Sequence, residues 1–272
     1  MTHNPLLLLA SWAFASFSFA ATPPDNAPTR VIQKITLDSD DATIQAAVDQ
    51  LIQDNGLREQ KEQGANFALP EVTKSKQGLE IKLGGSFFGE SPLHDISALK
   101  HVSASSIDLS FTQVTDLTVL SDMPLKTVIL SSRPGQKIDL RPLDGLPITH
   151  LQLDGRTVDL EQVATLKLTK LICVESIVRN LKSLEGMPLK ALVMRHCVVD
   201  DLNGLKGLPL EALDISGTQD NDYSVLKELP LSTLRISKDV DRNKIRFLEN
   251  SKTLTHINKQ PLAEFFKESP KP

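Results

Sequence analysis

The stretch PLKALVM at 188–194, followed by PLEALDI at 209–215 and PLSTLRI at 230–236, reveals the fold of this 272-residue chain. In each copy a leucine is followed by apolar residues three and five positions later. We number that leucine as relative position 0, so the pattern is apolar at positions 0, 3 and 5. Alternation of this kind is typical of a short strand with one buried face.

The pattern recurs at a nearly constant period. Weaker or equal copies are SASSIDL at 103–109, PLKTVIL at 124–130, PITHLQL at 147–153 and KLTKLIC at 167–173. Position 0 falls at residues 104, 125, 148, 168, 189, 210 and 231, so the successive spacings are 21, 23, 20, 21, 21 and 21. One coil of this length cannot bury its own apolar face. We therefore predict seven to eight stacked coils whose strands form one parallel sheet.

A second apolar segment follows each strand, as in Leu181 with Leu184 and Leu202 with Leu205. Its spacing of three predicts a turn of 3-10 helix on the side of the coil opposite the strand. Gly-Met-Pro at 186–188 and Gly-Leu-Pro at 207–209 come next, and proline ends that turn just before the following strand.

These residues resemble bacterial leucine-rich-repeat proteins with short, internalin-like repeats, over roughly residues 79–257. The resemblance implies an α/β solenoid, a right-handed coil with a concave parallel sheet, a convex side of 3-10 turns or short helices, and a protein-binding concave face. It does not identify the ligand. The family's buried asparagine is missing at position 8, where this chain has Thr112, Arg133, Arg156, Ser176, Cys197, Thr218 and Asp239. Arginine fits a buried slot poorly, so we expect local irregularity at Arg133 and Arg156.

Both ends of the solenoid carry predicted caps. Residues 39–78 form a helical cap region, in which Ser39-Asp40-Asp41 begins an amphipathic helix that Gly56 ends. The strand 79–83 then begins the solenoid. Residues 258–272 comprise a short helix at 261–267, which lays Leu262, Phe265 and Phe266 over the last coil, and a tail.

Within the first twenty residues, 6–10 and 12–20 form an apolar stretch that ends in Ser18-Phe19-Ala20, a small-x-small cleavage pattern. We interpret 1–20 as a signal peptide and the proline-rich stretch within 21–38 as a linker, which predicts a secreted or periplasmic protein. A retained membrane anchor is the alternative, because the segment has no Lys or Arg before its apolar run. No later segment is apolar for long enough to span a bilayer.

The content of charged and hydrophobic residues indicates whether the chain folds and whether it could bind nucleic acid. The chain has 24% charged and 40% hydrophobic residues, values that predict a folded domain. Its net charge is -4, and no Lys/Arg run is dense enough to follow a phosphate backbone. We therefore expect no nucleic-acid partner.

The sequence lacks the common motifs of catalytic nucleophiles, metal sites and phosphate-binding loops. There is no G-x-S-x-G, H-E-x-x-H, C-x-x-C, Walker loop or G-x-G-x-x-G. His94, His101 and His256 fall in different coils, so we expect no metal and no cofactor. Cys173 and Cys197 both point inward, but adjacent coils lie about 5 Å apart and three residues of offset add about 10 Å. We expect two buried thiols instead of a disulfide.

The outward positions 2, 4 and 6 of each strand, with the adjoining position 7, define the candidate binding surface. Its members are Ile129, Gln152, Lys170, Ile172, Val174, Val193, Arg195, His196, Asp214 and Arg235. Ile129, Ile172, Val174 and Val193 form an apolar patch where a solvated sheet would be polar, which suggests a contact surface. The alternative is that β-branched residues are there for strand propensity alone.

Three functions are compatible with these patterns. The first is a non-enzymatic, monomeric module that binds an unknown protein or peptide through the concave sheet. The second is an envelope-associated solenoid that assembles with copies of itself through poorly capped ends. The third is a hydrolase-like enzyme using Glu175, His196 and Ser216, which the absence of a pocket and of oxyanion donors disfavours. A ladder of surface ion pairs is the simpler interpretation of that cluster.

Overall fold

The computed structural model describes residues 39–85, 89–133, 137–218 and 222–267. The predicted signal peptide at 1–20, the linker at 21–38 and the Pro270–Pro272 tail lie outside the described residues. The chain divides into two units, Met1–Thr36 and Leu37–Pro272. All of the described residues belong to the second unit.

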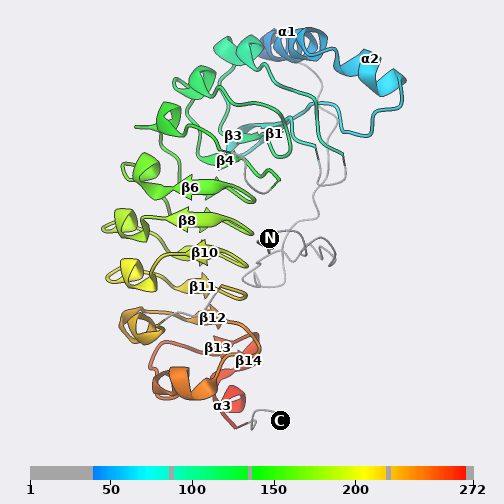
Figure 1. Cartoon of the computed structure of the whole chain (residues 1–272). Coiled ribbons are helices and arrows are strands. Elements are labelled where there is room, and N and C mark those ends of the chain that lie inside the picture. Colours follow the sequence, from blue (N-terminus) through cyan, green and yellow to red (C-terminus); the bar gives the residue numbers. More distant parts are fainter. Residues whose placement is uncertain (1–38, 86–88, 134–136, 219–221, 268–272) are drawn as a thin grey trace, which may run out of the picture. The chain divides into compact units, whose positions relative to one another are not determined.

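The second unit is a stack of coils, each of which adds one short strand to a long sheet (Figure 1). The residues at position 3 pair with one another from strand to strand and are all buried, as the repeat predicts. In spatial order the strands are β1 (Glu71–Ser75), β2 (Gly78–Lys82), β3 (Ser106–Asp108), β4 (Thr127–Ile129), β5 (His150–Gln152), β7 (Lys170–Ile172), β9 (Ala191–Val193), β11 (Ala212–Asp214), β12 (Thr233–Arg235), β13 (His256–Ile257) and β14 (Gln260–Pro261).

A 3-10 helix lies on the opposite side of each coil, and these helices stack along one side of the unit (Figure 1). The predicted back segments are confirmed: Leu181, Leu184, Leu202 and Leu205 are all buried within them. The eight 3-10 helices of the described residues are η1 (Ser97–His101), η2 (Thr118–Leu120), η3 (Arg141–Leu143), η4 (Leu160–Val163), η5 (Leu181–Leu184), η6 (Leu202–Leu205), η7 (Ser224–Glu228) and η8 (Arg242–Leu248). The core therefore lies between the long sheet and the 3-10 helices.

The predicted parallel sheet is present, and the structure adds two features that the sequence did not predict. A second parallel sheet joins β6 (Thr157–Asp159), β8 (Ile177–Arg179) and β10 (Val198–Val199). These strands begin at position 9, where β-branched pairs such as Ile177-Val178 and Val198-Val199 favour extended chain. In addition, β1 and β14 pair antiparallel with their neighbours, so each end of the long sheet closes with a reversed strand.

In five coils the residue at position 7 has a left-handed backbone, and in three of them a strand of the second sheet follows. Phe111, Glu175 and His196 have φ angles of 55°, 54° and 53°, and Gly155 and Gly217 have φ angles of 73°. A side chain at Gly155 would also place its Cβ 2.0 Å from the carbonyl oxygen of Ser132. Glycine therefore meets both the conformation and the close approach of the preceding coil there.

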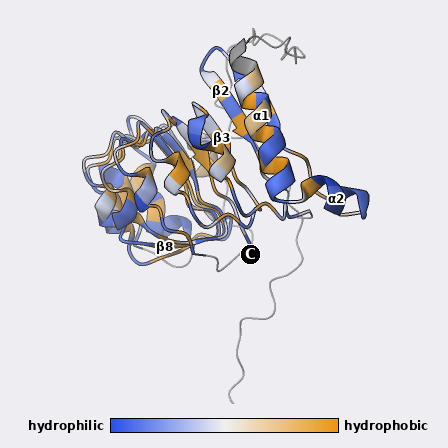
Figure 2. Cartoon of the chain, turned by 90° about the horizontal axis from the view of Figure 1, so that it is seen from above, coloured by the Kyte–Doolittle hydropathy of each residue, from blue (hydrophilic) through white to orange (hydrophobic). Residues whose placement is uncertain are grey.

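The N-terminal cap is helical, as predicted, and one buried asparagine joins it to the first coil. Helix α1 (Ser39–Asp54) packs its apolar side on η1, and an unpredicted helix α2 (Leu57–Glu62) starts directly after Gly56 (Figure 2). Asn55 donates through Nδ2 to the carbonyl oxygens of Leu51 and Asp95, at 2.9 and 2.8 Å. Its Oδ1 accepts from the amides of His94 and Asp95, at 2.9 and 3.0 Å. Three of these four side-chain hydrogen bonds thus join the cap to the first coil, and the fourth lies within the cap helix.

The C-terminal cap is shorter than predicted. Helix α3 runs only from Leu262 to Phe265, because β14 takes the residues just before it. Phe265 is nevertheless buried, and Leu262 and Phe266 pack against the core, as expected. The guanidinium of Arg242 lies 4.7 Å from the ring centre of Phe265 and donates to its carbonyl oxygen at 2.7 Å.

Other hydrogen-bond donors replace asparagine in the position 8 slot. Ser176 donates through its hydroxyl to Leu153 of the preceding coil at 3.1 Å, and Cys197 directs its thiol to the carbonyl oxygen of Cys173. Thr112 and Thr218 donate within their own coils, to Leu109 and Ile215. Both cysteines are buried free thiols, as predicted, and burial raises the pKa of Cys197 to about 12. Small donors therefore satisfy the inner carbonyl groups that asparagine would otherwise reach.

Arg156 occupies the position 8 slot, which the sequence predicts to suit arginine poorly. Its side chain is buried, and Nε donates to the carbonyl oxygen of Leu130 in the preceding coil. No carboxylate among the described residues pairs with it, and burial lowers its pKa from 12.5 to about 10. Arg133, by contrast, is exposed and pairs with Glu90 at 2.6 Å. The slot thus accepts a cation at an electrostatic cost.

We predict that Arg156→Gln stabilises the protein. The amide Nε2 of glutamine comes at the same position along the side chain as Nε of arginine, so the donor is kept while the buried charge is removed. We expect a gain of about 1–2 kcal/mol at pH 7, measured by urea unfolding followed by circular dichroism. The pKa of Arg156 is lower in the folded state than in the unfolded state. The free-energy cost of burying its charge is therefore fully present below pH 10, and it declines as pH rises through the folded pKa.

The pH series provides the control. The advantage of Arg156→Gln over the wild type should shrink between pH 9 and pH 11, a range that brackets the lowered pKa. A variant that is less stable than the wild type at pH 7 would show that packing of the long side chain outweighs its buried charge.

Candidate functional site

The outer sheet face is the side of the long sheet that points away from the core, formed by positions 2, 4 and 6. It is the face that the leucine-rich-repeat resemblance predicts to be concave. Position 4 forms one in-register row across seven strands. That row is Asp108, Ile129, Gln152, Ile172, Val193, Asp214 and Arg235. Most of the predicted binding residues thus lie in a single line.

The apolar part of this face is smaller than predicted. Ile129, Ile172 and Val174 are half-buried, as outward-facing residues should be. Val193 is only 6% exposed, which contradicts its assignment to an open patch. It lies in register between Ile172 and Asp214, and these neighbours cover it. Ile172 and Val174 therefore form one accessible apolar contact next to the covered Val193, and Gln152 separates it from Ile129 in the position 4 row.

A polar network lies on the N-terminal side of these apolar residues. Asp154, at position 6, accepts from the amide of Val174 at 2.8 Å and from the hydroxyl of Ser131 at 3.0 Å. The predicted site residue Gln152 also donates to it through Nε2. Asp154 was not among the site residues predicted from the sequence, although the same repeat numbering places it on this face. Its carboxylate is occupied by these three donors.

A charged cluster lies on the C-terminal side. Asp214 was expected to be exposed, but the structure buries it completely. Its Oδ1 accepts from the amide and hydroxyl of Ser216 at 3.1 and 2.6 Å. Its Oδ2 lies 3.6 Å from Nε of Arg195 and 3.7 Å from Nη1 of Arg235. The two arginines cover the carboxylate from the neighbouring coils, which explains its burial.

Two basic side chains, His150 and Lys170, pair in register at position 2. Burial lowers the pKa of His150, and the neighbouring Lys170 ammonium lowers it further. Nδ1 of His150 also lies 2.9 Å from the hydroxyl of Thr149. Both effects favour the neutral imidazole of His150.

The Glu175, His196 and Ser216 cluster does not form a catalytic triad in the structure. The hydroxyl of Ser216 donates to Asp214, and the ring of His196 packs against Gly217, where a Cβ would come within 2.2 Å of Nδ1. The backbone ladder explains the proximity of these residues, since the amide of Glu175 donates to Arg195 and that of His196 donates to Ser216. The expected ladder of surface ion pairs lies elsewhere, for example between Lys190 and Glu211 at 3.1 Å.

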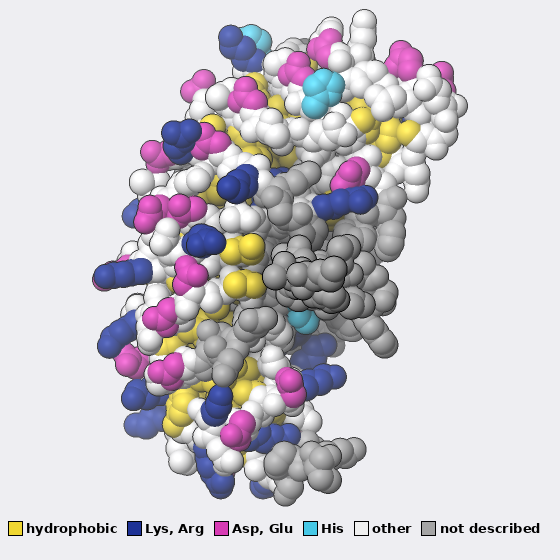
Figure 3. All heavy atoms as spheres, in the orientation of Figure 1, with side chains coloured by type: hydrophobic (Ala, Val, Ile, Leu, Met, Phe, Trp, Pro, Cys, Tyr) yellow, Lys and Arg dark blue, Asp and Glu magenta, His cyan; other side chains and the backbone are white. Residues whose placement is uncertain are grey.

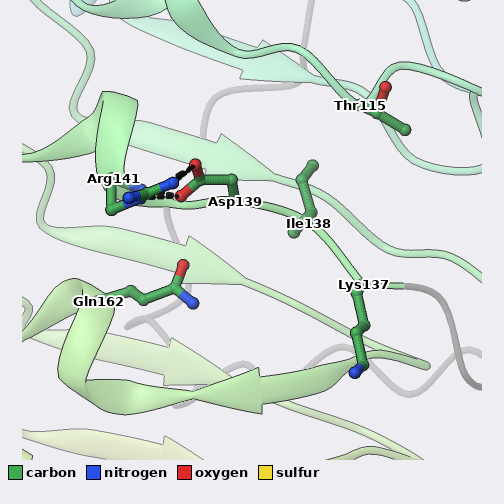
Figure 4. A pocket seen from close by; sticks show the side chains of 6 residues that line it. All are labelled: Thr115, Lys137, Ile138, Asp139, Arg141 and Gln162. Carbon is green, nitrogen blue, oxygen red and sulfur yellow. Dashed lines mark hydrogen bonds and ion pairs between the residues drawn. The ribbon is translucent and has the colours of Figure 1, made fainter.

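A hollow of about 350 Å³ lies beside the first strand of the second sheet (Figure 4). Figure 4 shows Arg141 turned towards Asp139, with which it pairs at 2.6 Å. Hydrogen bonds from the Arg141 side chain and backbone lower the pKa of Asp139 to about 2. Gln162 accepts from the amide of Leu140 at 2.9 Å. The lining is Thr115, Lys137, Ile138, Asp139, Arg141 and Gln162. Within this lining, the Asp139 carboxylate is thus engaged by Arg141, and the Gln162 side chain is engaged by the backbone.

The described residues hold neither a metal-binding cluster nor a membrane-spanning helix. Within residues 39–85, 89–133, 137–218 and 222–267, no group of three His, Cys, Asp or Glu side chains is arranged to hold a metal ion. Over the same ranges, none of the helices combines the length and apolar character that crossing a bilayer requires.

The repeated strand, the opposed 3-10 helix and the buried apolar positions define a leucine-rich-repeat solenoid with coils of about 21 residues. Among solved structures, internalin C2 from Listeria monocytogenes is similar to this chain, with 23% identity and a TM-score of 0.46. The match covers 53% of this chain and 66% of that chain, so this chain spans just under two thirds of that protein's length. No protein-family model matches the sequence. No curated protein matches it either.

We predict that Asp214→Asn lowers the free energy of unfolding by about 3 kcal/mol, because it leaves two neighbouring guanidinium groups without their shared counter-charge. Urea unfolding followed by circular dichroism measures this change. Glu211→Gln is the matched control, since it removes an exposed carboxylate from the same strand region and should cost less than about 1 kcal/mol. Equal effects of the two substitutions would contradict the structural role of Asp214.

Proposed function

We propose that this chain is a non-enzymatic leucine-rich-repeat module that binds a protein or peptide through the outer sheet face. The observation that carries the proposal is the pair Ile172 and Val174, which remain half-buried on a face where the other outward positions are mostly polar or small. Apolar side chains at the centre of a contact, with polar groups at its rim, are typical of binding surfaces. Gln152 and Asp154 on one side, and Arg195 and Arg235 on the other, supply that rim.

The module acts as a monomer, outside the cell or in the periplasm. The prediction of a signal peptide at 1–20 supports the location. The two caps support the monomer, since Asn55 fastens the N-terminal helix and Phe265 is buried over the last coil. These caps disfavour end-to-end assembly of solenoids, because they cover the apolar end coils that such assembly would use.

We expect Ile172→Glu to abolish binding of the partner, because it places a charge at the centre of the apolar contact. The test is affinity capture from the native cell envelope with the wild type and the variant as bait. Ile177→Glu is the matched control: it lies in the same coil, is 40% exposed and belongs to the second sheet. Figure 3 shows hydrophobic side chains on that second surface, over β8 and β10.

A partner captured by the wild type and by Ile177→Glu, but lost with Ile172→Glu, supports binding on the outer sheet face. Loss with Ile177→Glu alone would move the binding surface to the second sheet. Thermal unfolding of both variants confirms that the comparison involves folded proteins.

A further inference from the structure

The cluster of Arg195, Asp214 and Arg235 holds its charges in an unusual arrangement. The carboxylate of Asp214 is fully buried, and Ser216 satisfies only its Oδ1. Oδ2 has no hydrogen bond, although it faces both guanidinium groups at 3.6 and 3.7 Å. At these distances the carboxylate attracts both guanidinium groups electrostatically. The separations nevertheless exceed the length of an N–H···O hydrogen bond. Asp214 thus fixes the position of the guanidinium groups without engaging their N–H groups.

Arg195 has guanidinium N–H groups that can donate hydrogen bonds to a ligand. Its Nε is buried and makes no hydrogen bond, and within the described part of the chain its side chain contacts an anion only at Asp214. The side chain as a whole is 32% exposed, so parts of it other than Nε are accessible from the outer sheet face. A ligand therefore binds the N–H groups at the end of the guanidinium, while Nε stays turned towards Oδ2 of Asp214.

The neighbours of Arg195 define what else the ligand must carry. Val193 and Arg195 belong to one coil, and Ile172 and Val174 belong to the coil before it, in register. Asp214 lies two strands beyond Ile172 in the same row, a separation of about 10 Å at the usual strand spacing. An extended peptide covers that distance in about three residues.

We propose that Arg195, positioned by Asp214 together with Arg235, binds the side-chain carboxylate of an acidic residue in a peptide that crosses the coils along the outer sheet face. A carboxylate fits because its two oxygens match the paired N–H groups of a guanidinium. An aliphatic side chain about three residues away in the peptide contacts Ile172 and Val174. Arg195 is the binding residue, and Asp214 is a positioning residue. This inference rests on the proposed binding function of the face.

The experiment uses a phage-displayed library of random dodecamer peptides, selected on the full wild-type chain. We expect the enriched peptides to carry Asp or Glu about three residues from Leu, Ile or Val. Fluorescence anisotropy then measures the Kd of synthetic copies for the wild type and for Arg195→Gln. The variant should bind about tenfold more weakly, the loss expected for one charge-assisted contact. Arg179→Gln, an exposed arginine of the second sheet, is the matched control and should bind like the wild type.

Changing the acidic residue of the peptide to its amide should cause the same loss with the wild type, and no further loss with Arg195→Gln. This coupling separates direct recognition from an effect on folding.

The outcomes distinguish the inference from the function on which it rests. Peptides that bind Arg195→Gln as tightly as the wild type, but are lost with Ile172→Glu, overturn the acidic recognition and leave the binding face intact. A selection that enriches no peptide, or only peptides that Ile172→Glu still binds, overturns both.

Discussion

Contact between successive coils governs how this chain folds. A strand of three residues exposes both of its hydrogen-bonding edges, and its single inward side chain cannot form a core alone. Leu213 illustrates the solution, since it is buried between Leu192 and Leu234, its partners in the adjacent strands. Each coil therefore obtains its sheet pairing and most of its core from its neighbours. The caps are needed for the same reason, because the first and last coils lack one neighbour.

Stacking of the coils also creates the candidate binding surface. Stacking in register aligns the outward residues of one strand with those of the next, so positions on separate coils become neighbours at a regular spacing. Arg195, Asp214 and Arg235 come from three coils, yet both guanidinium groups lie within 3.7 Å of the Asp214 carboxylate. A row of this kind can present an apolar contact and a charged one at a fixed separation, which is what recognition of an extended peptide requires.

The sequence predicts the part of the structure that repeats. The apolar periodicity places Leu192 and Leu213 in the core, and it aligns position 4 into one row, because a constant period leaves only one register. It does not predict the burial of Val193 and Asp214, since alternation gives the direction of a side chain but not the cover that neighbouring coils provide. The repeat pattern does not predict the burial of Arg156 either, because that burial depends on a carbonyl group of the preceding coil.

The non-repeating parts were the least predictable. The β-branched pairs Ile177-Val178 and Val198-Val199 could have indicated the second sheet, but they lie outside the leucine pattern. The role of Asn55 depends on residues 94 and 95, about forty positions along the chain, and no local pattern signals that contact. The candidate site follows the same division: its members were predictable from the repeat numbering, whereas the pairing of Asp214 with two arginines required the structure.

Hydrogen exchange of Leu213→Asp, measured by mass spectrometry, is the sharpest test of the dependence of each coil on its neighbours. A lone buried carboxylate at this position has no partner in either adjacent coil. If the coils depend on one another, amide exchange becomes faster in β9 and β12 as well as in β11, while Glu211→Gln leaves all three strands protected. Loss of protection confined to β11, or none, would contradict that dependence.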